Sequence, residues 1–389
     1  MVSFLFNPYI YESSISDLIS ELCFPEARRV AQFAIDIYDA SIFGWTERSV
    51  ATKFGLKEIE DIALKDFTST EHPRFVILTD HSNQNVVLCI RGTYSIGDAI
   101  LDIVCDEVPF LDGFAHHGMV DGANRILAKS MPVLRSLLLD RFPGYKLRVT
   151  GHSLGAGTAE LITMLLISKT HEESQWLSKI DIKCVALAPP PVYRPRTPNQ
   201  PLQEEIQQNI LIFVNGNDCV PRLSLANCAW LLSALRAVDG LNLSVLDQLS
   251  IIFQKTTYKK ELPLIQPIQT VKENLQKVIT AMQGIDVNYQ EKFRYLSHPS
   301  KDVYYLNPVY NDNNKGSSVL SVSLIRKKAK HFSHLLLMFS KMLADHFQWS
   351  YEAALNKVAY KTDSVDTKDV NHSKENVVTS NQGSSLVLI

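Results

Sequence analysis

The chain has 389 residues, of which 46% are apolar and 21% charged, the composition of a globular protein with a sizeable core. Basic residues number 39 against 41 acidic ones, a net charge of −2, so the charge balance gives no reason to expect a nucleic acid as partner. No stretch approaches the roughly 20 apolar residues of a membrane span, so any membrane contact is expected at the surface.

The first 72 residues are expected to form a mostly helical N-terminal region. Apolar residues recur at three- and four-residue spacing over 14–22 and again over 26–38, which is typical of amphipathic helices. Two short apolar strands follow at 75–79 and 86–90, joined by a polar segment of turn-forming residues.

Helices and strands alternate through the middle of the chain. The pattern predicts a helix at 117–141, a strand at 146–150 and a strongly apolar helix at 154–168, with buried strands at 182–187 and 210–214. This alternation indicates an α/β fold with a mostly parallel central sheet and helices on both faces.

The last part of the chain is expected to complete one domain over residues 73–361. Residues 222–290 look like a helical insertion between sheet elements. Strand signals return at three places: 303–306, 319–325 and 332–338. Residues 362–389 are polar and without periodicity, so a disordered tail is expected.

The six cysteines are sparse and form no C-x-x-C pair, which argues against a zinc ribbon or a thioredoxin-like site. The first thirty residues lack the pattern of a signal peptide. A reduced, cytoplasmic protein is therefore expected.

A nucleophile turn is indicated by Gly151-His152-Ser153-Leu154-Gly155, which matches G-x-S-x-G between a predicted strand and an apolar helix. A serine in this tight strand-to-helix turn projects its hydroxyl clear of the sheet. The helix start also offers unpaired N–H groups, such as that of Leu154, where an oxyanion would form. Ser153 is therefore the candidate nucleophile.

Three separated motifs in this order resemble the class 3 lipases, and within them the diacylglycerol-lipase-like branch: IRGTYS at 90–95, GHSLGAG at 151–157 and NDCVPRLS at 217–224. The resemblance spans roughly residues 73–360. It implies an α/β-hydrolase fold and a serine esterase that cleaves lipid esters of acylglycerols, with no metal or organic cofactor. Two alternatives stay open, a phospholipase A1 on the same scaffold and a catalytically inactive lipid-binding or scaffold protein.

The resemblance implies a catalytic triad of Ser153, Asp218 and His346. The acid follows a buried strand, and the histidine lies in an Asp-His pair with Tyr351 downstream. The chain order Ser, Asp, His is the one expected of this kind of sheet. Asp218 could instead cap a helix, and three other histidines are rivals for the base: His298, His331 and His334.

The second oxyanion donor is expected from the loop after the strand at 86–90. The resemblance assigns it to Thr93, paired with the N–H of Leu154, and makes Asp102 the brace of this loop. Thr93 could instead belong to an ordinary turn at the strand end, and Asp102 could equally be a surface carboxylate. Residues 94–101, extended to about 114, would form a lid, or else a plain amphipathic helix on the core.

Two clusters have simpler alternatives. The adjacent pair His116-His117 suggests a metal, but neighbours in sequence rarely ligate one ion together, and a structural role is favoured. The run of basic residues at 326–330 could touch an anionic lipid surface or form a solvated strand end.

Apolar residues in 222–290 could cover the edge of the active site.

Overall fold

The computed structural model describes residues 24–41, 46–68, 73–93, 107–168, 172–197, 200–244, 246–247, 269–270, 272–274, 276–278, 280–281, 296–310, 319–332 and 340–358. The helix expected at 14–22, the tail at 362–389 and the core of the expected lid at 94–101 lie outside these residues. So do Asp102 and most of the segment between 248 and 295.

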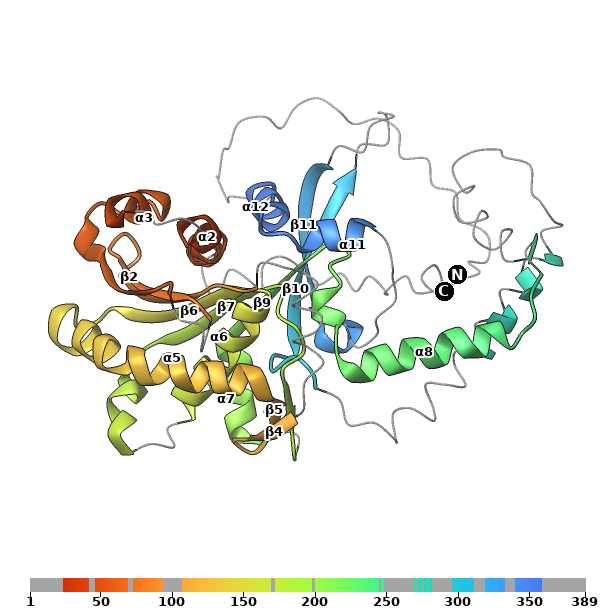
Figure 1. The fold of residues 1–389 in the computed structure, drawn as a ribbon, viewed down its shortest axis with the longest axis horizontal. Helices are drawn as coiled ribbons and strands as arrows, with labels where there is room; N and C mark the ends of the chain where they lie inside the picture. Colours follow the sequence, from red (N-terminus) through yellow and green to blue (C-terminus); the bar gives the residue numbers. More distant parts are fainter. Residues whose placement is uncertain are drawn as a thin grey trace, which may run out of the picture.

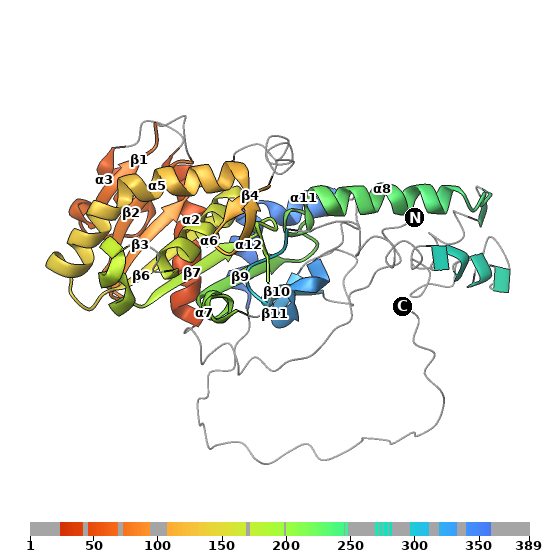
Figure 2. The ribbon, with the colours of Figure 1, turned by 90° about the horizontal axis from the view of Figure 1, so that it is seen from below.

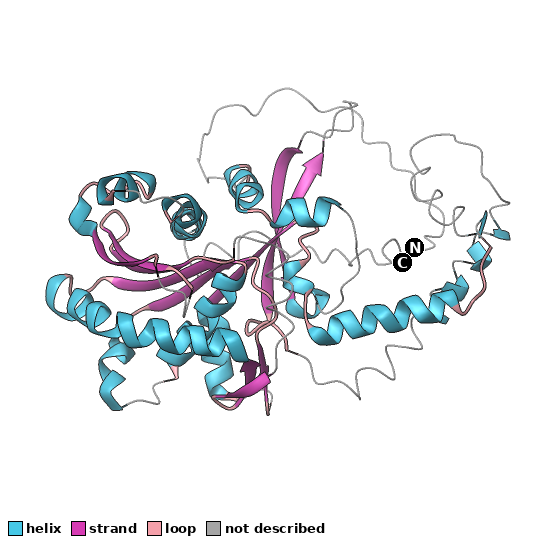
Figure 3. Cartoon of the chain, in the orientation of Figure 1, coloured by secondary structure: helices cyan, strands magenta, loops and turns pink. Residues whose placement is uncertain are grey.

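One eight-stranded sheet forms the centre of the molecule (Figures 1 and 3). Its strands, in spatial order, are β1 (Ile62–Asp66), β2 (Phe75–Asp80), β3 (Asn85–Ile90), β6 (Lys146–His152), β7 (Ile182–Leu187), β9 (Ile210–Asn215), β10 (Asp302–Tyr310) and β11 (Val319–Lys328). The neighbours from β3 to β10 are parallel, whereas β1, β2 and β11 pair antiparallel at the edges. The predicted α/β class with a mostly parallel sheet is confirmed.

Helices cover both faces of this sheet (Figure 1). The first face carries α2 (Phe24–Ala40), α3 (Glu47–Lys53) and α12 (Gln348–Asn356). The second face carries α5 (His117–Arg135), α6 (Leu154–Ile167) and α7 (Pro201–Asn209). Because both faces are covered, the central strands are continuous apolar runs rather than alternating ones.

Strand β3 shows how one short sequence serves both cores. Val86, Leu88 and Ile90 pack toward α5 and α6, while Val87 and Cys89 pack toward α2 and α3. All six residues of the strand are buried. The period-two alternation of side chains thus divides the strand between two layers.

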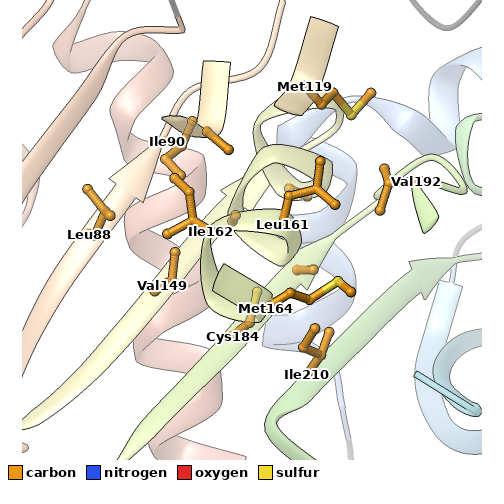
Figure 4. Packing of buried hydrophobic residues seen from close by; sticks show 14 of the residues in the cluster. Leu88, Ile90, Met119, Val149, Leu161, Ile162, Met164, Cys184, Val192 and Ile210 are labelled. Atoms are coloured by element: carbon orange, nitrogen blue, oxygen red, sulfur yellow. The ribbon is translucent and has the colours of Figure 1, made fainter. Parts of the chain in front are cut away.

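Helix α6 lies in the middle of the second core. All of its residues but one are buried, because it packs against the sheet on one side and α5 on the other. In Figure 4, Leu161, Ile162 and Met164 of α6 lie among side chains of the neighbouring strands, including Val149 and Cys184. This packing fixes the start of α6, where Ser153 lies.

The structure differs from the sequence-based predictions at several places. Residues 62–66 form strand β1 inside the region expected to be helical. Phe332 ends the 3-10 turn η6 (Ala329–Phe332) instead of starting a strand. The helix expected at 117–141 changes to a π-helical turn, η3 (Ser136–Arg141), just after Pro132, which lacks the N–H that an α-helix would use.

A small second sheet was not anticipated. It consists of β4 (Glu107–Phe110), β5 (Gly113–His116) and β8 (Tyr193–Pro195). Strands β4 and β5 form an antiparallel hairpin, so residues 107–114, the outer part of the expected lid, do not form the amphipathic helix that was its alternative.

The described residues also include η2 (Ile59–Asp61), η4 (Glu172–Lys179), η5 (Val220–Arg222), α8 (Leu225–Asp239) and α11 (Ser340–His346). Helix α8 starts near the end of β9 and runs away from the sheet in both views (Figures 1 and 2). Among the described residues, no helix is both long and apolar enough to cross a lipid bilayer.

Candidate active site

Ser153 occupies a strained turn between β6 and α6. Its backbone has φ 60° and ψ −130°, a conformation that costs a residue with a side chain roughly 1–3 kcal/mol. The turn is held in place because the N–H of Ser153 donates to the carbonyl of Leu187 on β7 over 2.9 Å. The serine hydroxyl is thereby directed out of the end of the sheet.

The start of α6 lies directly against the loop that follows β3. A methyl group on Gly155 would be 2.5 Å from the carbonyl oxygen of Ile90 and 2.7 Å from the nitrogen of Gly92. Real Cβ atoms do not approach that closely, so only glycine allows this contact. The segment from Ile90 to Gly92 is therefore brought beside the serine turn.

The structure brings Ser153, His346 and Asp218 together in one hydrogen-bonded row. The serine Oγ lies 2.9 Å from Nε2 of His346. Nδ1 of the same ring lies 3.0 and 3.1 Å from the two carboxylate oxygens of Asp218. Since a carboxylate only accepts, Nδ1 carries the proton and Nε2 is left to accept from the serine hydroxyl.

Asp218 is fully buried, and each of its oxygens has a further donor. The hydroxyl of Tyr351 donates to Oδ2 over 2.7 Å, and the N–H of Val220 donates to Oδ1 over 2.9 Å. Burial and the nearby Asp218 raise the pKa of Tyr351 well above its usual range, so the phenol stays a donor. The carboxylate is thus aimed at His346 while it also accepts from the first residue of η5.

A second set of contacts joins the His346 segment to the end of β9. The N–H of Asn217 donates to Oδ2 of Asp345 over 2.8 Å. The side-chain amide of Asn215 donates to the main-chain oxygen of Asp345 over 3.1 Å. Asp218 and His346, 128 residues apart in the chain, are therefore fixed relative to each other by backbone as well as side-chain contacts.

The rival histidines are not in this row. His298 is buried, and its Nε2 is 2.9 Å from the carbonyl of Pro221. Burial lowers its pKa to about 4. His334 lies outside the described residues, and of His331 only the backbone is described.

Three groups around the triad were not predicted as site residues. His152 contacts the main-chain oxygen of His346, and Tyr38 contacts His152. Tyr351 donates to Asp218. Only Tyr351 had a signal in the sequence, its position shortly after the Asp-His pair. The role of Tyr38 depends on how α2 packs on the sheet, which local sequence does not reveal.

The adjacent histidines at the start of α5 have separate structural roles. His116 is buried and accepts from the N–H of Met119 through Nδ1, as a helix N-cap does. His117 is exposed and pairs with Asp121 one turn later. In the part of the chain that the structure describes, no group of three or more His, Cys, Asp or Glu is arranged to hold a metal ion.

The basic run at 326–330 does not form an open cationic patch. Arg326 and Lys328 both pair with Asp302, at 2.5 and 2.7 Å. Lys327 is buried with its ammonium 3.7 Å from the centre of the Tyr305 ring. Two of these cations are thus already paired and one is buried, and contact of this run with anionic lipid stays a prediction.

The mostly parallel sheet, the strained serine at a strand-to-helix turn and its histidine partner define the class of α/β-hydrolases. Residues 87–228 match the family model for lipase (class 3). This segment of the chain is therefore similar to the class 3 lipases.

Curated relatives match part of the chain. Human diacylglycerol lipase-alpha is 33% identical over 165 residues, which cover 39% of this chain and 14% of that protein. Mouse diacylglycerol lipase-beta is 28% identical over 39% of this chain and 22% of its own. The secreted mono- and diacylglycerol lipase A of Penicillium cyclopium is 30% identical over 42% of this chain and 51% of its own. The chain thus spans at most about half the length of these relatives.

Solved structures of fungal lipases also align with the chain. A mutant of the Penicillium cyclopium lipase MDLA has 26% identity and a TM-score of 0.41, covering 55% of this chain and 76% of its own. A Rhizomucor miehei lipase bound to its propeptide has 21% identity and a TM-score of 0.42, covering 55% of this chain and 64% of its own.

Proposed function

We propose that the chain is a serine hydrolase that cleaves carboxylic esters of acylglycerols through an acyl-enzyme on Ser153. One observation carries the proposal, the continuous row of hydrogen bonds from Ser153 through His346 to Asp218. The names of the matched relatives, which are mono- and diacylglycerol lipases, support the substrate class. Neither a metal nor an organic cofactor enters the proposed reaction.

The chemistry follows from the properties of the three groups. A serine hydroxyl is a poor nucleophile at neutral pH, so His346 would take its proton as Oγ attacks the ester carbonyl. Nε2 would then return the proton to the leaving alcohol, and the acyl group would remain on Ser153. A water molecule, deprotonated in turn by His346, would release the fatty acid. Asp218 would keep the imidazole in the required tautomer and stabilise its charged form.

We further propose that the N–H groups of Thr93 and Leu154 stabilise the oxyanion. The close contact of Gly155 with Ile90, Arg91 and Gly92 supports this, because Thr93 directly follows that segment. Leu154 is the first residue of that helix, where a backbone N–H has no partner within the helix. Removing one such donor typically lowers kcat by about 10²–10³.

Contact with a lipid surface is part of the proposal, since acylglycerols reside in such surfaces. Most of the large apolar side chains that the described residues expose lie on or just beyond α8 and on α11–α12: Leu232, Leu235, Leu246, Leu343 and Trp349. Two of them flank His346 closely in sequence. Contiguous exposed apolar patches mark interaction surfaces, and the proposal requires these side chains to form one.

Labelling with a fluorophosphonate probe tests the nucleophile. The wild-type protein should be labelled and Ser153→Ala should not, with equal thermal stability as the control for folding. Labelling that persists in Ser153→Ala would contradict the assignment, and a folded wild-type protein that is neither labelled nor active would leave the inactive scaffold as the better description.

The substrate class needs a second measurement. The purified protein should release fatty acid from diacylglycerol faster than from phosphatidylcholine of the same acyl chains. The reverse preference would favour the phospholipase A1 alternative, because both reactions use the same three residues and differ only in the head group that is accommodated. The cytoplasmic location and the domain limits expected from the sequence stay predictions.

A further inference from the structure

A second histidine lies directly behind the triad and has no role in the proposed chemistry. The ring of His152 is buried, with its centre 4.8 Å from that of His346. Its Nε2 is 2.8 Å from the main-chain oxygen of His346, and its Nδ1 is 2.9 Å from the hydroxyl of Tyr38. One imidazole therefore joins the serine turn, the histidine segment and helix α2.

The partners of His152 determine where its proton lies. A main-chain carbonyl only accepts, so Nε2 must carry the proton and donate to His346. Burial, together with the adjacent His346, lowers the pKa of His152 well below its usual range, and the ring is neutral. Nδ1 is then an acceptor, and the hydroxyl of Tyr38 donates to it. A hydrogen-bonded chain runs from Tyr38 through His152 to the backbone of His346.

The carbonyl of His346 needs this donor. His346 is the last residue of α11, and the final carbonyls of a helix have no partner within it. Buried polar groups without a partner are costly and are relieved by local movement. Movement here would change the 2.9 Å separation between Nε2 of His346 and Oγ of Ser153.

Tyr38 lies at the point where the other segments of the site meet. A methyl group on Gly92 would be 2.5 Å from its hydroxyl, 2.4 Å from the carbonyl of His152 and 3.2 Å from Cβ of Ser153. Tyr38 belongs to α2, outside the segment at 87–228 that matches the lipase family model. Helix α2 is therefore connected to the triad by a polar contact as well as by packing.

We propose that His152 is a positioning residue, which sets the place of His346 by donating to its main-chain carbonyl, and that Tyr38 holds His152 in the tautomer that makes this donation possible. The inference rests on the proposed function, because it assigns His152 and Tyr38 to the reaction through His346. It predicts that both residues affect turnover more than substrate affinity.

The test uses the full chain and a soluble p-nitrophenyl ester, with four variants. His152→Phe keeps a ring but removes the donor, and His152→Gln retains an N–H that can reach the same carbonyl. Tyr38→Phe removes the hydroxyl that fixes the tautomer. Tyr145→Phe is the matched control, because its hydroxyl also lies 2.9 Å from a histidine Nδ1, that of His81, at the opposite end of β6.

We expect His152→Phe to lower kcat by about 100-fold, the effect of a misplaced catalytic group, with KM within about threefold of wild type. The kcat of His152→Gln should be at least about tenfold higher than that of His152→Phe. Tyr38→Phe should have a lower kcat than Tyr145→Phe. Thermal unfolding of each variant checks the fold. If His152→Phe does not fold, the comparison of Tyr38→Phe with Tyr145→Phe decides.

Several outcomes would overturn the inference. These are an unchanged kcat in folded His152→Phe, a loss in His152→Gln as large as in His152→Phe, or equal kcat in Tyr38→Phe and Tyr145→Phe. An inactive and unlabelled wild-type protein would instead overturn the proposed function, so the two failures are distinguishable.

Discussion

The hydroxyl of Tyr351 bridges the N–H of Asn215 on β9 and the carboxylate of Asp218 in the turn that follows. It donates to Oδ2 of Asp218 over 2.7 Å and accepts from the N–H of Asn215 over 2.9 Å. A single buried oxygen thus satisfies a main-chain donor and orients a carboxylate, although Tyr351 and Asp218 are 133 residues apart. The position of Asp218 depends on α12 as much as on β9, the strand that precedes it.

Replacing Tyr351 by phenylalanine tests this relationship. The variant leaves the N–H of Asn215 buried without an acceptor and removes one donor from Asp218. The free energy of unfolding should therefore fall by about 1–3 kcal/mol, and kcat should fall while KM changes little. Urea unfolding and steady-state kinetics measure the two effects. Wild-type kcat in a destabilised Tyr351→Phe would show that the tyrosine serves the fold alone.

Exposed leucines of α8 provide a second prediction. Leu232 and Leu235 are 56% and 43% exposed, and their replacement by serine removes apolar area without opening a cavity. Hydrolysis of diacylglycerol in vesicles should fall several-fold through weaker surface binding, at about 25 cal/mol per Å² of apolar area. Hydrolysis of a soluble ester should not change. A matched replacement of the exposed Leu139, outside the α8 and α11–α12 region, serves as control.

Equal losses on vesicles and on soluble ester in the α8 variant would point to a change at the triad rather than at a lipid surface. Equal activity of the α8 variant and Leu139→Ser on vesicles would also contradict the surface proposed here.

A buried ion pair ties α2 to the sheet. Arg148 of β6 is fully buried, with Nε 2.9 Å from Glu26 of α2 and Nη2 2.8 Å from Asp181. Arg148→Met leaves the Glu26 carboxylate without this partner and should cost about 3–5 kcal/mol in unfolding free energy. Arg326→Met, at the more exposed pair with Asp302, should cost about 1 kcal/mol or less. Urea unfolding of both variants gives the comparison, and similar losses would contradict it.

The buried His298 makes stability depend on pH. Burial lowers its pKa from 6.5 to about 4, so below pH 6.5 the unfolded chain binds a proton that the folded protein does not. The contribution of neutral His298 to the free energy of unfolding is fully present above pH 6.5. It is lost as the pH falls from 6.5 to about 4, at roughly 1.4 kcal/mol per pH unit.

The check is to measure unfolding free energies of wild type and His298→Gln at pH 7, 6 and 5. Glutamine retains an N–H for the carbonyl of Pro221 but does not titrate in this range. The difference between the two proteins should therefore shift in favour of the variant as the pH falls. A constant difference would contradict the buried neutral state of His298.

The sequence revealed those parts of the site that depend on local pattern. Ser153 was recognisable because a strand, a glycine-containing turn and an apolar helix follow each other directly. Asp218 and His346 needed a family resemblance, since nothing in the residues around them indicates which distant side chain they meet. His152 and Tyr38 could not be linked from the sequence, because their contact forms only when α2 packs across β6.

The fold was predictable where strands are buried on both faces and therefore read as apolar runs. Strand β1 was missed because its five residues are only partly buried and include Lys65 and Asp66, so they lack a clear apolar run. Phe332 was assigned to a strand from its apolar surroundings, but the chain leaves the sheet after Lys328.

The positive φ of Ser153 sets activity against stability at one residue. Glycine would adopt that backbone conformation without strain, so the substitution Ser153→Gly would add up to about 1–3 kcal/mol of stability and remove the nucleophile. Selection for a robust fold alone would therefore replace the serine. Stability screens of this protein will therefore tend to enrich variants that lack the proposed nucleophile.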